Sequence, residues 1–337
     1  MDTPYYFVTG GAGFIGSHVV RFLLTHTQAS VVNIDCLSYA SRPQALADLA
    51  NHPRYLFSQT DINDGAALTE LFQRHQPQAV LHLAAESHVD NAIHSPEAFI
   101  YSNVQGTFSL LEATRLYWQG LEGAEQAAFR FLHVSTDEVF GDLPFGADPL
   151  TEDAPYRPSN PYSASKAASD HLVNAWHRTY GLPTLMTHCT NNFGPWQHPE
   201  KLIPHMLSCA LKEAPLPLYG DGLNSRDWLY VEDHVQALWA VLQGGQIGTS
   251  YHISAQQESS NLALVTQLCQ QLDALKPRAN GQSYTDLITF VTDRPGHDVR
   301  YALNADRLKD TLNWHIKVDF NTRLRETVSE YLAKEHP

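Results

Sequence analysis

The chain has few cysteines and no cysteine motif. Its four cysteines are Cys36, Cys189, Cys209 and Cys269, and no two lie close enough in sequence to form a CxxC pair. This spacing excludes a zinc ribbon and does not suggest a disulfide framework. Reduced thiols fit the cytoplasm best, so we expect a cytoplasmic protein.

Long apolar runs are also missing, because no stretch reaches the roughly 18 residues that a membrane span requires. Residues 1–4 lack the basic start and apolar centre of a signal peptide. Positive charge is scarce: 22 Lys and Arg stand against 36 Asp and Glu, a net charge of −14. Such a chain binds nucleic acid and anionic membranes poorly, so we expect neither as a partner. An anionic ligand would need a local cluster of donors.

What the chain does have is core-building material, since 43% of its residues are hydrophobic. This share excludes wholesale disorder. The first half alternates short apolar runs with helical patterns. The predicted strands are 5–9, 31–35, 55–59, 79–83, 130–135 and 184–187, and the predicted helices are 14–25, 66–74, 96–118 and 161–180. Strands that alternate with helices indicate right-handed βαβ units and a doubly wound parallel sheet of the α/β class.

The pattern loosens after residue 190, where five prolines between 195 and 217 interrupt it. Helices are predicted further on at 231–243, 262–272 and 321–333. We therefore predict two parts. Residues 1–190, with a returning segment at about 230–255, form a Rossmann domain, and residues 191–337 form mainly a smaller α/β lobe.

A glycine-rich turn lies between the first predicted strand and the first predicted helix. Residues 10–16 read Gly-Gly-Ala-Gly-Phe-Ile-Gly, which matches both GxxGxxG and GxGxxG. Such glycines permit a tight turn, close approach of the backbone to a pyrophosphate, and close packing of helix on strand. The helix N-terminus adds free N–H groups and a positive dipole end. The turn predicts a dinucleotide site, and a purely structural turn is the alternative.

Asp35 ends the second predicted strand, 19 residues after Gly16. A carboxylate at this place accepts hydrogen bonds from both ribose hydroxyls and repels a 2′-phosphate, which favours NAD over NADP. The alternative is an Asp that only caps its own loop. Asp61 follows the third predicted strand, where it can face the adenine amino group.

Tyr162 and Lys166 stand at i and i+4 on one predicted helix, so they share a face. An ammonium close to a phenol lowers the pKa of the phenol from about 10 toward neutrality. The pair then forms a general base for an alcohol hydroxyl, and Thr136 can hydrogen-bond the same hydroxyl. A surface Tyr–Lys pair is the alternative, but the upstream glycine turn favours a short-chain dehydrogenase/reductase.

Thr136 is followed directly by Asp137 and Glu138. A simple alcohol dehydrogenase needs neither carboxyl. Two carboxyls beside a hydride-transfer centre indicate added proton chemistry, one group removing a proton and the other delivering one. Both serve one cleft only if the chain turns there, because neighbouring side chains of a strand face opposite ways. A solvated acidic loop tip is the alternative.

At this point the sequence resembles a known family. The segments that carry the resemblance are 84–90 (AAESHVD), 135–141 (STDEVFG), 160–166 (NPYSASK), 190–195 (TNNFGP), 199–204 (PEKLIP), 219–222 (YGDG), 226–234 (RDWLYVEDH) and 293–298 (DRPGHD). They resemble the dTDP-glucose 4,6-dehydratases, a family of extended short-chain dehydrogenases/reductases, over nearly the whole chain. The triplet 136–138 discriminates best, because sister epimerases and decarboxylases lack the Asp-Glu pair.

The resemblance implies a lyase that converts dTDP-glucose to dTDP-4-keto-6-deoxyglucose and water at bound NAD. Tyr162, helped by Thr136 and Lys166, would deprotonate the C4 hydroxyl while hydride moves from C4 to NAD. Glu138 would then take the C5 proton, and Asp137 would protonate the departing C6 hydroxyl. Hydride would finally return to C6.

The resemblance also implies the binding residues, and no metal. Those for NAD are Gly10, Gly13, Phe14, Ile15, Gly16, Asp35, Cys36, Leu37, Ser38, Asp61, Ile62, Leu83, Ala84, Ala85, Ser87, Ser102, Tyr162, Lys166 and Asn192. Those for the nucleotide sugar are Ser87, Thr136, Asn191, Lys201, Leu202, Pro217, Leu218, Tyr219, Arg226, Asn261, Asp293, Arg294 and His297. A dianion in an acidic protein needs such cations. For both arginines a structural salt bridge is the alternative, and for His88 and His297 a structural histidine.

The resemblance implies a homodimer in which helices 96–118 and 161–180 pair across a two-fold axis. Both helices carry apolar residues beyond the needs of one face, namely Phe99, Phe108, Leu110, Leu111, Leu116, Tyr117, Leu172, Val173 and Trp176. Two other functions stay open: another NAD-dependent nucleotide-sugar epimerase or decarboxylase, and a non-catalytic NAD-binding regulator. The regulator would lack catalytic groups, yet all five candidates are present. Thymine against uracil stays open as well.

Overall fold

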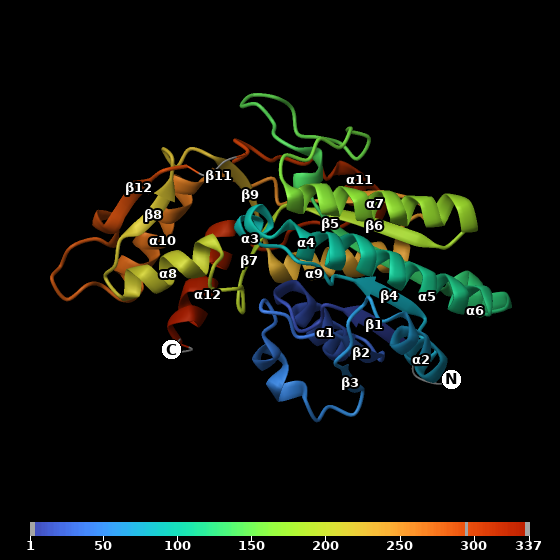
Figure 1. Cartoon of the computed structure of the whole chain (residues 1–337). Helices are drawn as coiled ribbons and strands as arrows, with labels where there is room; N and C mark the ends of the chain where they lie inside the picture. The colour runs from blue at the N-terminus through green and yellow to red at the C-terminus, as the bar shows by residue number, and fades with distance from the viewer. Residues whose placement is uncertain (1–3, 294–295, 334–337) are drawn as a thin grey trace.

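The larger part of the molecule is built on a seven-stranded parallel sheet (Figure 1). A computed structural model describes residues 4–293 and 296–333. In spatial order the strands are β10 (Ser250–Ile253), β6 (Thr184–Cys189), β5 (Arg130–Thr136), β4 (Ala79–His82), β1 (Tyr5–Thr9), β2 (Ser30–Ile34) and β3 (Tyr55–Ser58). Strand order reverses between β1 and β4, and such a switch point opens a crevice at the carboxyl ends of the strands. The predicted doubly wound α/β fold is therefore confirmed.

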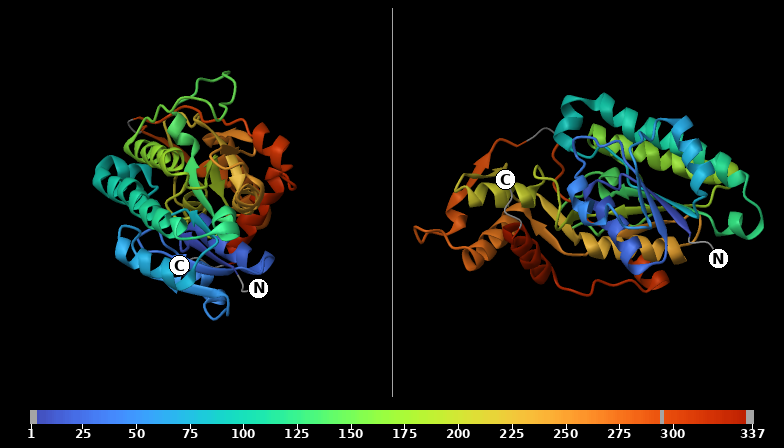
Figure 2. Two further views of the ribbon diagram at one scale, coloured as in Figure 1. Left: turned by 90° about the vertical axis from the view of Figure 1, so that its right-hand side faces the viewer. Right: turned by 90° about the horizontal axis from the view of Figure 1, so that it is seen from below.

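Helices cover both faces of this sheet, as the right-hand view of Figure 2 shows for α5 and α7 on one side and α9 on the other. One face packs on α1 (Phe14–His26), α9 (Val231–Gly244) and α11 (Asp306–Leu312). The other face packs on α2 (Gly65–His75), α5 (Thr107–Gln119) and α7 (Pro161–Tyr180). Because both faces are covered, the central strands are almost wholly buried, and their apolar runs are the signal that predicted them.

Helix α7 has a start and an end that its sequence encodes. The side chain of Asn160 accepts a hydrogen bond from the Ser163 N–H, and Ser163 Oγ lies 3.2 Å from the Asn160 nitrogen, which completes a capping box. Pro161 occupies the first helical position, and Gly181 ends the helix in the left-handed conformation with φ = 76°. These signals explain why the predicted bounds of this helix are confirmed.

The predicted helix at 96–118 contains a wider turn. It consists of α4 (Pro96–Phe99), a π-helical segment η2 (Ile100–Gly106) and α5. Within the π-helical segment, the Asn103 side chain bonds the backbone N–H and C=O of Glu86 at 2.8 and 3.0 Å, and it donates to Ser165 Oγ at 2.8 Å. The wider π-helical turn lets the Asn103 side-chain amide contact Glu86 and Ser165, two residues from distant segments. The periodicity of the sequence does not reveal this turn.

A smaller lobe lies beyond the carboxyl ends of the large sheet, on the left in Figure 1. Its three-stranded sheet has the order β11 (Glu258–Ser260), β9 (Ser225–Tyr230) and β7 (Asn191–Phe193), and its two-stranded sheet pairs β12 (Ile288–Val291) with β8 (Leu216–Tyr219). Helices α8 (Leu202–Leu211), α10 (Asn261–Leu275) and α12 (Phe320–Ala333) pack around a separate apolar core. These short strands and α8 were not predicted, because prolines and glycines break their patterns.

The chain crosses between the two parts more than once. Strand β10, at Ser250–Ile253, pairs with β6 of the large sheet although the strands before it belong to the smaller lobe. Further on, Leu303 bridges to Leu150 and Arg300 bridges to Ser225. The remaining short helices are α3 (Val89–His94) and α6 (Gly123–Ala128), with 3-10 turns η1 (Pro43–Leu49), η3 (Asp137–Phe140) and η4 (Tyr284–Leu287). Within the described ranges, no helix combines the length and apolarity that a membrane crossing needs.

Candidate active site

A cavity of about 420 Å³ lies at the carboxyl ends of the large sheet, where the smaller lobe faces it. The predicted site residues that line it are Gly10, Gly13, Phe14, Ile15, Gly16, Asp35, Cys36, Ser38, Asp61, Ile62, Leu83, Ala84, Ala85, Ser87, Ser102, Thr136, Asp137, Glu138, Tyr162, Lys166, Asn191, Asn192 and Lys201. Segments from residue 10 to residue 201 therefore meet in one hollow, at the place that a switch point predicts.

The glycine turn forms one wall of the cavity. Gly10 has φ = +71°, and a Cβ there would lie 2.7 Å from the backbone of Ala84. A Cβ on Gly16 would lie 2.0 Å from the Gly10 carbonyl oxygen, so neither position accepts a side chain. Helix α1 begins after Gly13 with no side-chain cap, and its first residues line the cavity. Its N-terminal N–H groups are therefore suited to phosphate oxygens.

Asp35 is buried at the same wall and takes part in its own loop. Its carboxylate accepts hydrogen bonds from the N–H groups of Ala12 and Leu37 at 2.9 and 2.8 Å, and from Ser41 Oγ at 2.9 Å. A carboxylate has about four acceptor positions, so one remains for a ligand hydroxyl. Asp35 thus caps its own loop and also lines the cavity, so the loop-capping role and a place in the predicted ribose site are compatible.

Tyr162, Lys166 and Thr136 meet at the floor of the cavity, between α7 and the end of β5. The Lys166 ammonium donates to the Val134 carbonyl at 2.9 Å. Burial raises the pKa of the Tyr162 phenol well above its usual value, the charge of Glu138 adds to the rise, and a hydrogen bond with Thr136 opposes it. Desolvation of the phenolate is the largest cause of this shift, which runs opposite to the lowering that the Tyr–Lys spacing predicts.

Asp137 and Glu138 both line the cavity because the chain turns where β5 ends. The short 3-10 turn η3 starts at Asp137, and the Thr136 hydroxyl donates to Asp137 Oδ1 at 3.1 Å. Asp137 Oδ2 is buried without a hydrogen-bond partner among the described residues. Burial, followed by the negative charge of Glu138, raises the pKa of the Asp137 carboxyl well above its usual value. Asp137 is thus suited to hold a proton and deliver it into the cavity.

Three predicted residues reach the cavity from the smaller lobe's side. The Asn192 amide donates to the Thr190 carbonyl at 2.9 Å, and its oxygen lies 2.8 Å from His234 Nδ1. Lys201 Nζ donates to the Ser87 carbonyl at 3.0 Å, which joins two residues of the predicted substrate set. Asn191 lies beside them on β7. The two lobes therefore share this part of the cavity wall.

The other predicted substrate residues lie outside the cavity lining. Tyr219 packs edge-on against His297 with ring centres 6.0 Å apart, and His297 Nδ1 lies 2.7 Å from Asp293 Oδ1. Pro217 and Leu218 stand beside Tyr219 on β8, Asn261 starts α10, and Leu202 starts α8. Leu37 lies outside the lining too, although its N–H bonds Asp35. Arg294 lies outside the described residues.

Arg226 is 6% exposed and its guanidinium bonds backbone carbonyls. It donates to Ser225 and Asp298 at 2.8 Å each and to Val299 at 3.3 Å, and it lies over the Tyr301 ring at 4.5 Å. These contacts are not the salt bridge that the sequence left as the alternative. Its charge also lowers the pKa of Asp137, against burial, so it lies within electrostatic reach of the cavity.

Sequence reasoning missed several lining residues. They are Ile34, Ala40, Ser41, Thr60, Asn63, Glu86, Ala98, Tyr101, Val134, Ser135, Cys189, Thr190, Gln197 and His198. Glu86 belongs to segment 84–90, which carries the family resemblance, and this membership is the signal that could have identified it. Burial raises the pKa of the Glu86 carboxyl. Gln197 and His198 sit in a proline-rich loop with no pattern. Among the described residues, no three His, Cys, Asp or Glu side chains form a metal cluster.

Comparisons with known proteins agree with this geometry. A family model described as GDP-mannose 4,6 dehydratase matches residues 7–327. The dTDP-glucose 4,6-dehydratase of Neisseria meningitidis serogroup B is 54% identical over 327 residues, which cover 96% of this chain and 92% of that protein. The chain belongs to the dTDP-glucose 4,6-dehydratase family.

Solved structures of two dTDP-glucose 4,6-dehydratases have the same fold. The enzyme of Bacillus anthracis, in complex with NAD, is 38% identical to this chain and has a TM-score of 0.87. The match covers 99% of this chain and 97% of the Bacillus chain. The enzyme of Streptomyces venezuelae, with NAD and TYD bound, is 39% identical with the same TM-score, over 98% and 97% of the two chains. Both resemblances span the two lobes and the cavity between them.

Proposed function

We propose that the chain is an NAD-dependent dTDP-glucose 4,6-dehydratase, a hydro-lyase that forms dTDP-4-keto-6-deoxyglucose and water. The observation that carries the proposal is the pair Asp137 and Glu138 beside Tyr162, Thr136 and Lys166 in one cavity. Oxidation of an alcohol needs only the last three. The two carboxyls are suited to an elimination, and the raised pKa of Asp137 gives one of them the proton that an acid must hold. Membership of the dTDP-glucose 4,6-dehydratase family supports the same activity.

The residues around the glycine turn fit NAD. The uncapped start of α1 provides N–H groups for a diphosphate, and Asp35 keeps one acceptor position for a ribose hydroxyl while it disfavours a 2′-phosphate. When bound, NAD supplies the acceptor for the hydride and, in its oxidised form, a positive charge that favours the Tyr162 phenolate. Because the hydride returns in the same turnover, the enzyme has no need to release its cofactor.

In the proposed sequence, the chain's own residues move three protons. Tyr162, with Thr136 on the same hydroxyl, removes the proton of the C4 hydroxyl. With the C4 hydride passed to NAD, C4 becomes a keto carbon that acidifies C5, and Glu138 removes the C5 proton. Asp137 then protonates the C6 hydroxyl, which leaves as water. The hydride returns to C6, and Glu138 gives a proton back to C5. The buried setting and raised pKa of Asp137 suit the acid of this pair, because one carboxyl must begin protonated and the other ionised.

We also propose a division of labour between the two parts of the chain. Residues 1–190, with the returning segment at about 230–255, bind NAD, and residues 191–337 mainly bind the nucleotide sugar. Asn191 would meet the sugar or phosphates and Lys201 would line the nucleotide site, while Arg226 and His297 would lie around the diphosphate and its ribose. The four cysteines form no disulfide among the described residues, which fits the cytoplasm that we propose as the location.

The proposed homodimer rests on the outer faces of α5 and α7. Phe99, Leu110, Leu111 and Val173 belong to the core of a single chain, so they are not available to a partner. By contrast, Phe108 and Leu116 are 40% and 58% exposed, and Tyr101 and Tyr180 add apolar surface near them. A two-fold pairing of these faces would cover them. Light scattering at micromolar concentration should give the mass of two chains, and a monomer mass would contradict the dimer.

Product analysis tests the proposed activity. Purified protein is incubated separately with dTDP-glucose and UDP-glucose, and the sugar product is identified by mass and by NMR. We expect a 4-keto-6-deoxy sugar and a preference for the thymidine nucleotide. A C4 epimer or a pentose product would instead identify an epimerase or a decarboxylase. Denatured protein should release NAD or NADH, and its absence would contradict tight cofactor binding.

A further inference from the structure

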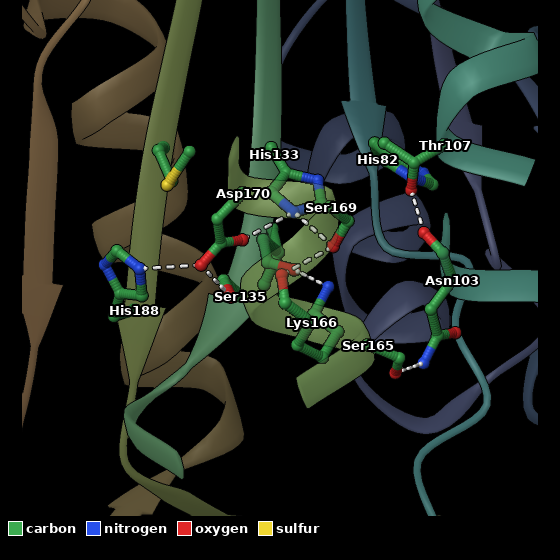
Figure 3. Close-up of polar contacts among 12 residues, drawn as sticks. His82, Asn103, Thr107, His133, Ser135, Ser165, Lys166, Ser169, Asp170 and His188 are labelled. Atoms are coloured by element: carbon green, nitrogen blue, oxygen red, sulfur yellow. Dashed lines mark hydrogen bonds and ion pairs between the residues drawn. The ribbon is translucent and has the colours of Figure 1, made fainter. Parts of the chain in front are cut away.

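A network of buried polar side chains lies behind the cavity, between β5, β6 and α7 (Figure 3). Its centre is Asp170, which is 0% exposed. His133 is also wholly buried, and His188 is 1% exposed. None of these three lines the cavity, and none has a part in the proposed reaction. A buried carboxylate is costly unless its partners compensate it, so the network calls for an explanation.

The Asp170 carboxylate accepts three hydrogen bonds from the two neighbouring strands. His133 Nε2 lies 3.0 Å from Oδ1, while Ser135 Oγ and His188 Nε2 lie 2.9 and 3.1 Å from Oδ2. An ionised carboxylate only accepts, so both histidines carry a proton on Nε2. Burial alone would raise the pKa of Asp170, but the hydrogen bonds from His133 and His188 lower it well below its usual value. Asp170 is therefore a carboxylate at neutral pH.

Asp170 stands one helical turn after Lys166 on α7. The Lys166 ammonium donates to the carbonyl of Val134, and the residues on either side of Val134 are His133 and Ser135, which both bond Asp170. Three contacts thus fasten the same three residues of β5 to one turn of α7, as Figure 3 shows. Thr136, the next residue along β5, begins the catalytic triplet.

We propose that Asp170 is a positioning residue for the reaction, because it fastens β5 to α7 and keeps a fixed negative charge one turn from Lys166. The fastening holds Tyr162 and Lys166 in register with Thr136, Asp137 and Glu138. The charge keeps Lys166 an ammonium while the ammonium is buried. This inference rests on the proposed function, since it assigns a role within that reaction.

The electrostatics of Lys166 support the second half of this role. Burial lowers the pKa of the Lys166 ammonium, and the Asp170 carboxylate opposes the shift, with a smaller contribution from Cys189. The titratable groups that face this pair are His82 on β4, His133 on β5, His188 and Cys189 on β6, Tyr156 before α7, and Tyr162 on α7 itself. Burial raises the pKa of Cys189 to about 12, and burial lowers that of His133 to about 4, so neither carries a charge at neutral pH. Among the charges that oppose the lowering of the Lys166 pKa, that of Asp170 contributes most.

The test is the pH dependence of turnover in Asp170→Asn, which keeps the shape of the side chain and removes its charge. Without the carboxylate the pKa of Lys166 falls, so the alkaline limb of the kcat profile should move to lower pH by about 1 unit. A carboxylate with a merely structural role would lower kcat equally at every pH. The matched control is Asp233→Asn, a buried carboxylate that lies 3.7 Å from Arg323 and outside the cavity. We expect this control to lower the melting temperature without moving the limb.

If the folded Asp170→Asn enzyme keeps the alkaline limb of its kcat–pH profile at the wild-type pH, the proposal is overturned, whether or not kcat falls. If that variant does not fold, Ser135→Ala decides, because it removes one bond to Asp170 and keeps the charge. We expect kcat to fall about two- to tenfold, with the KM for dTDP-glucose and the alkaline limb unchanged. A kcat within twofold of wild type overturns the proposal. Wild-type turnover of dTDP-glucose is measured first, since its absence would refute the proposed function rather than the role of Asp170.

Discussion

The large sheet and the smaller lobe contribute to the site in different ways. In the large sheet, each contributing segment is a strand end or the helix that follows it, so a few consecutive residues place several functional groups at once. The glycine turn and the triplet 136–138 are examples, and all of their predicted residues line the cavity. In the smaller lobe, Asn191, Asn192 and Lys201 line the cavity, but Tyr219, Asn261 and His297 come from three separate segments and do not.

This difference shows what kind of function each part can hold. Groups that exchange protons need positions fixed to a fraction of an ångström, and a parallel sheet fixes its strand ends through its hydrogen-bond register. Groups that bind a nucleotide tolerate larger shifts in position, and the positions of residues on short strands joined by loops vary more readily. We therefore expect substitutions in the large sheet to change kcat, and substitutions in the smaller lobe to change KM.

The largest effects should follow loss of a base in the large sheet. Tyr162→Phe and Glu138→Gln should each lower kcat on the order of 10²–10⁴-fold. They differ in what accumulates: Tyr162→Phe cannot oxidise C4, whereas Glu138→Gln should oxidise C4 and then stall. Absorbance of reduced nicotinamide should therefore rise only in Glu138→Gln. Near-normal turnover of that variant, with solvent deuterium entering C5, would show that Glu138 positions the substrate instead.

Loss of the acid should have a smaller effect than loss of a base. Asp137→Asn should lower kcat about 10²-fold, at the low end for one positioned proton donor. The loss should be less with a 6-fluoro substrate, because fluoride leaves without a proton. Because burial raises the pKa of Asp137, the wild-type enzyme should keep its acid to a higher pH than an ordinary carboxyl would, and lose it as pH rises through that pKa. Equal losses for the hydroxyl and fluoro substrates would contradict this assignment.

A substitution in the smaller lobe should separate binding from catalysis. Arg226→Lys keeps a charge but cannot reach the three carbonyls that hold the guanidinium. We expect the KM for dTDP-glucose to rise about tenfold with kcat nearly unchanged, as loss of a charged hydrogen bond predicts. Steady-state kinetics and a melting curve check this. A lower melting temperature with an unchanged KM would show that Arg226 only stabilises the lobe.

Low pH should destabilise the large sheet more than the smaller lobe. Burial lowers the pKa of His133 to about 4 and that of His234 to about 3, while an unfolded histidine titrates near 6.5. Between these values the unfolded chain binds more protons, so the free energy of unfolding falls as pH drops below about 6.5 and is unaffected above it. His205, in the smaller lobe, is exposed. Hydrogen exchange resolved by peptide at pH 7.5 and 5.5, corrected for the slower intrinsic exchange in acid, should show lower protection at the lower pH mainly in β5 and α9.

The sequence predicted the fold class and most of the large sheet because its signals are local. The short apolar runs of the strands, the helical patterns and the glycine turn each act within a few residues. The π-helical turn at Asn103 could not be predicted, since the contacts with Glu86 and Ser165 that hold it come from distant segments. The pKa of Tyr162 could not be predicted either, because burial is a property of the whole fold. The roles assigned to single residues of the cavity stay predictions.

Strand β10 has a consequence for how the chain is made. It completes the large sheet on the open edge of β6, yet it is synthesised after β7, α8, β8 and β9. While the ribosome adds the roughly 60 residues between them, the β6 edge has no neighbour and its backbone groups are a template for pairing with other chains. A nascent chain that stalls between residues 190 and 250 should therefore depend on chaperones more than one that stalls after residue 253.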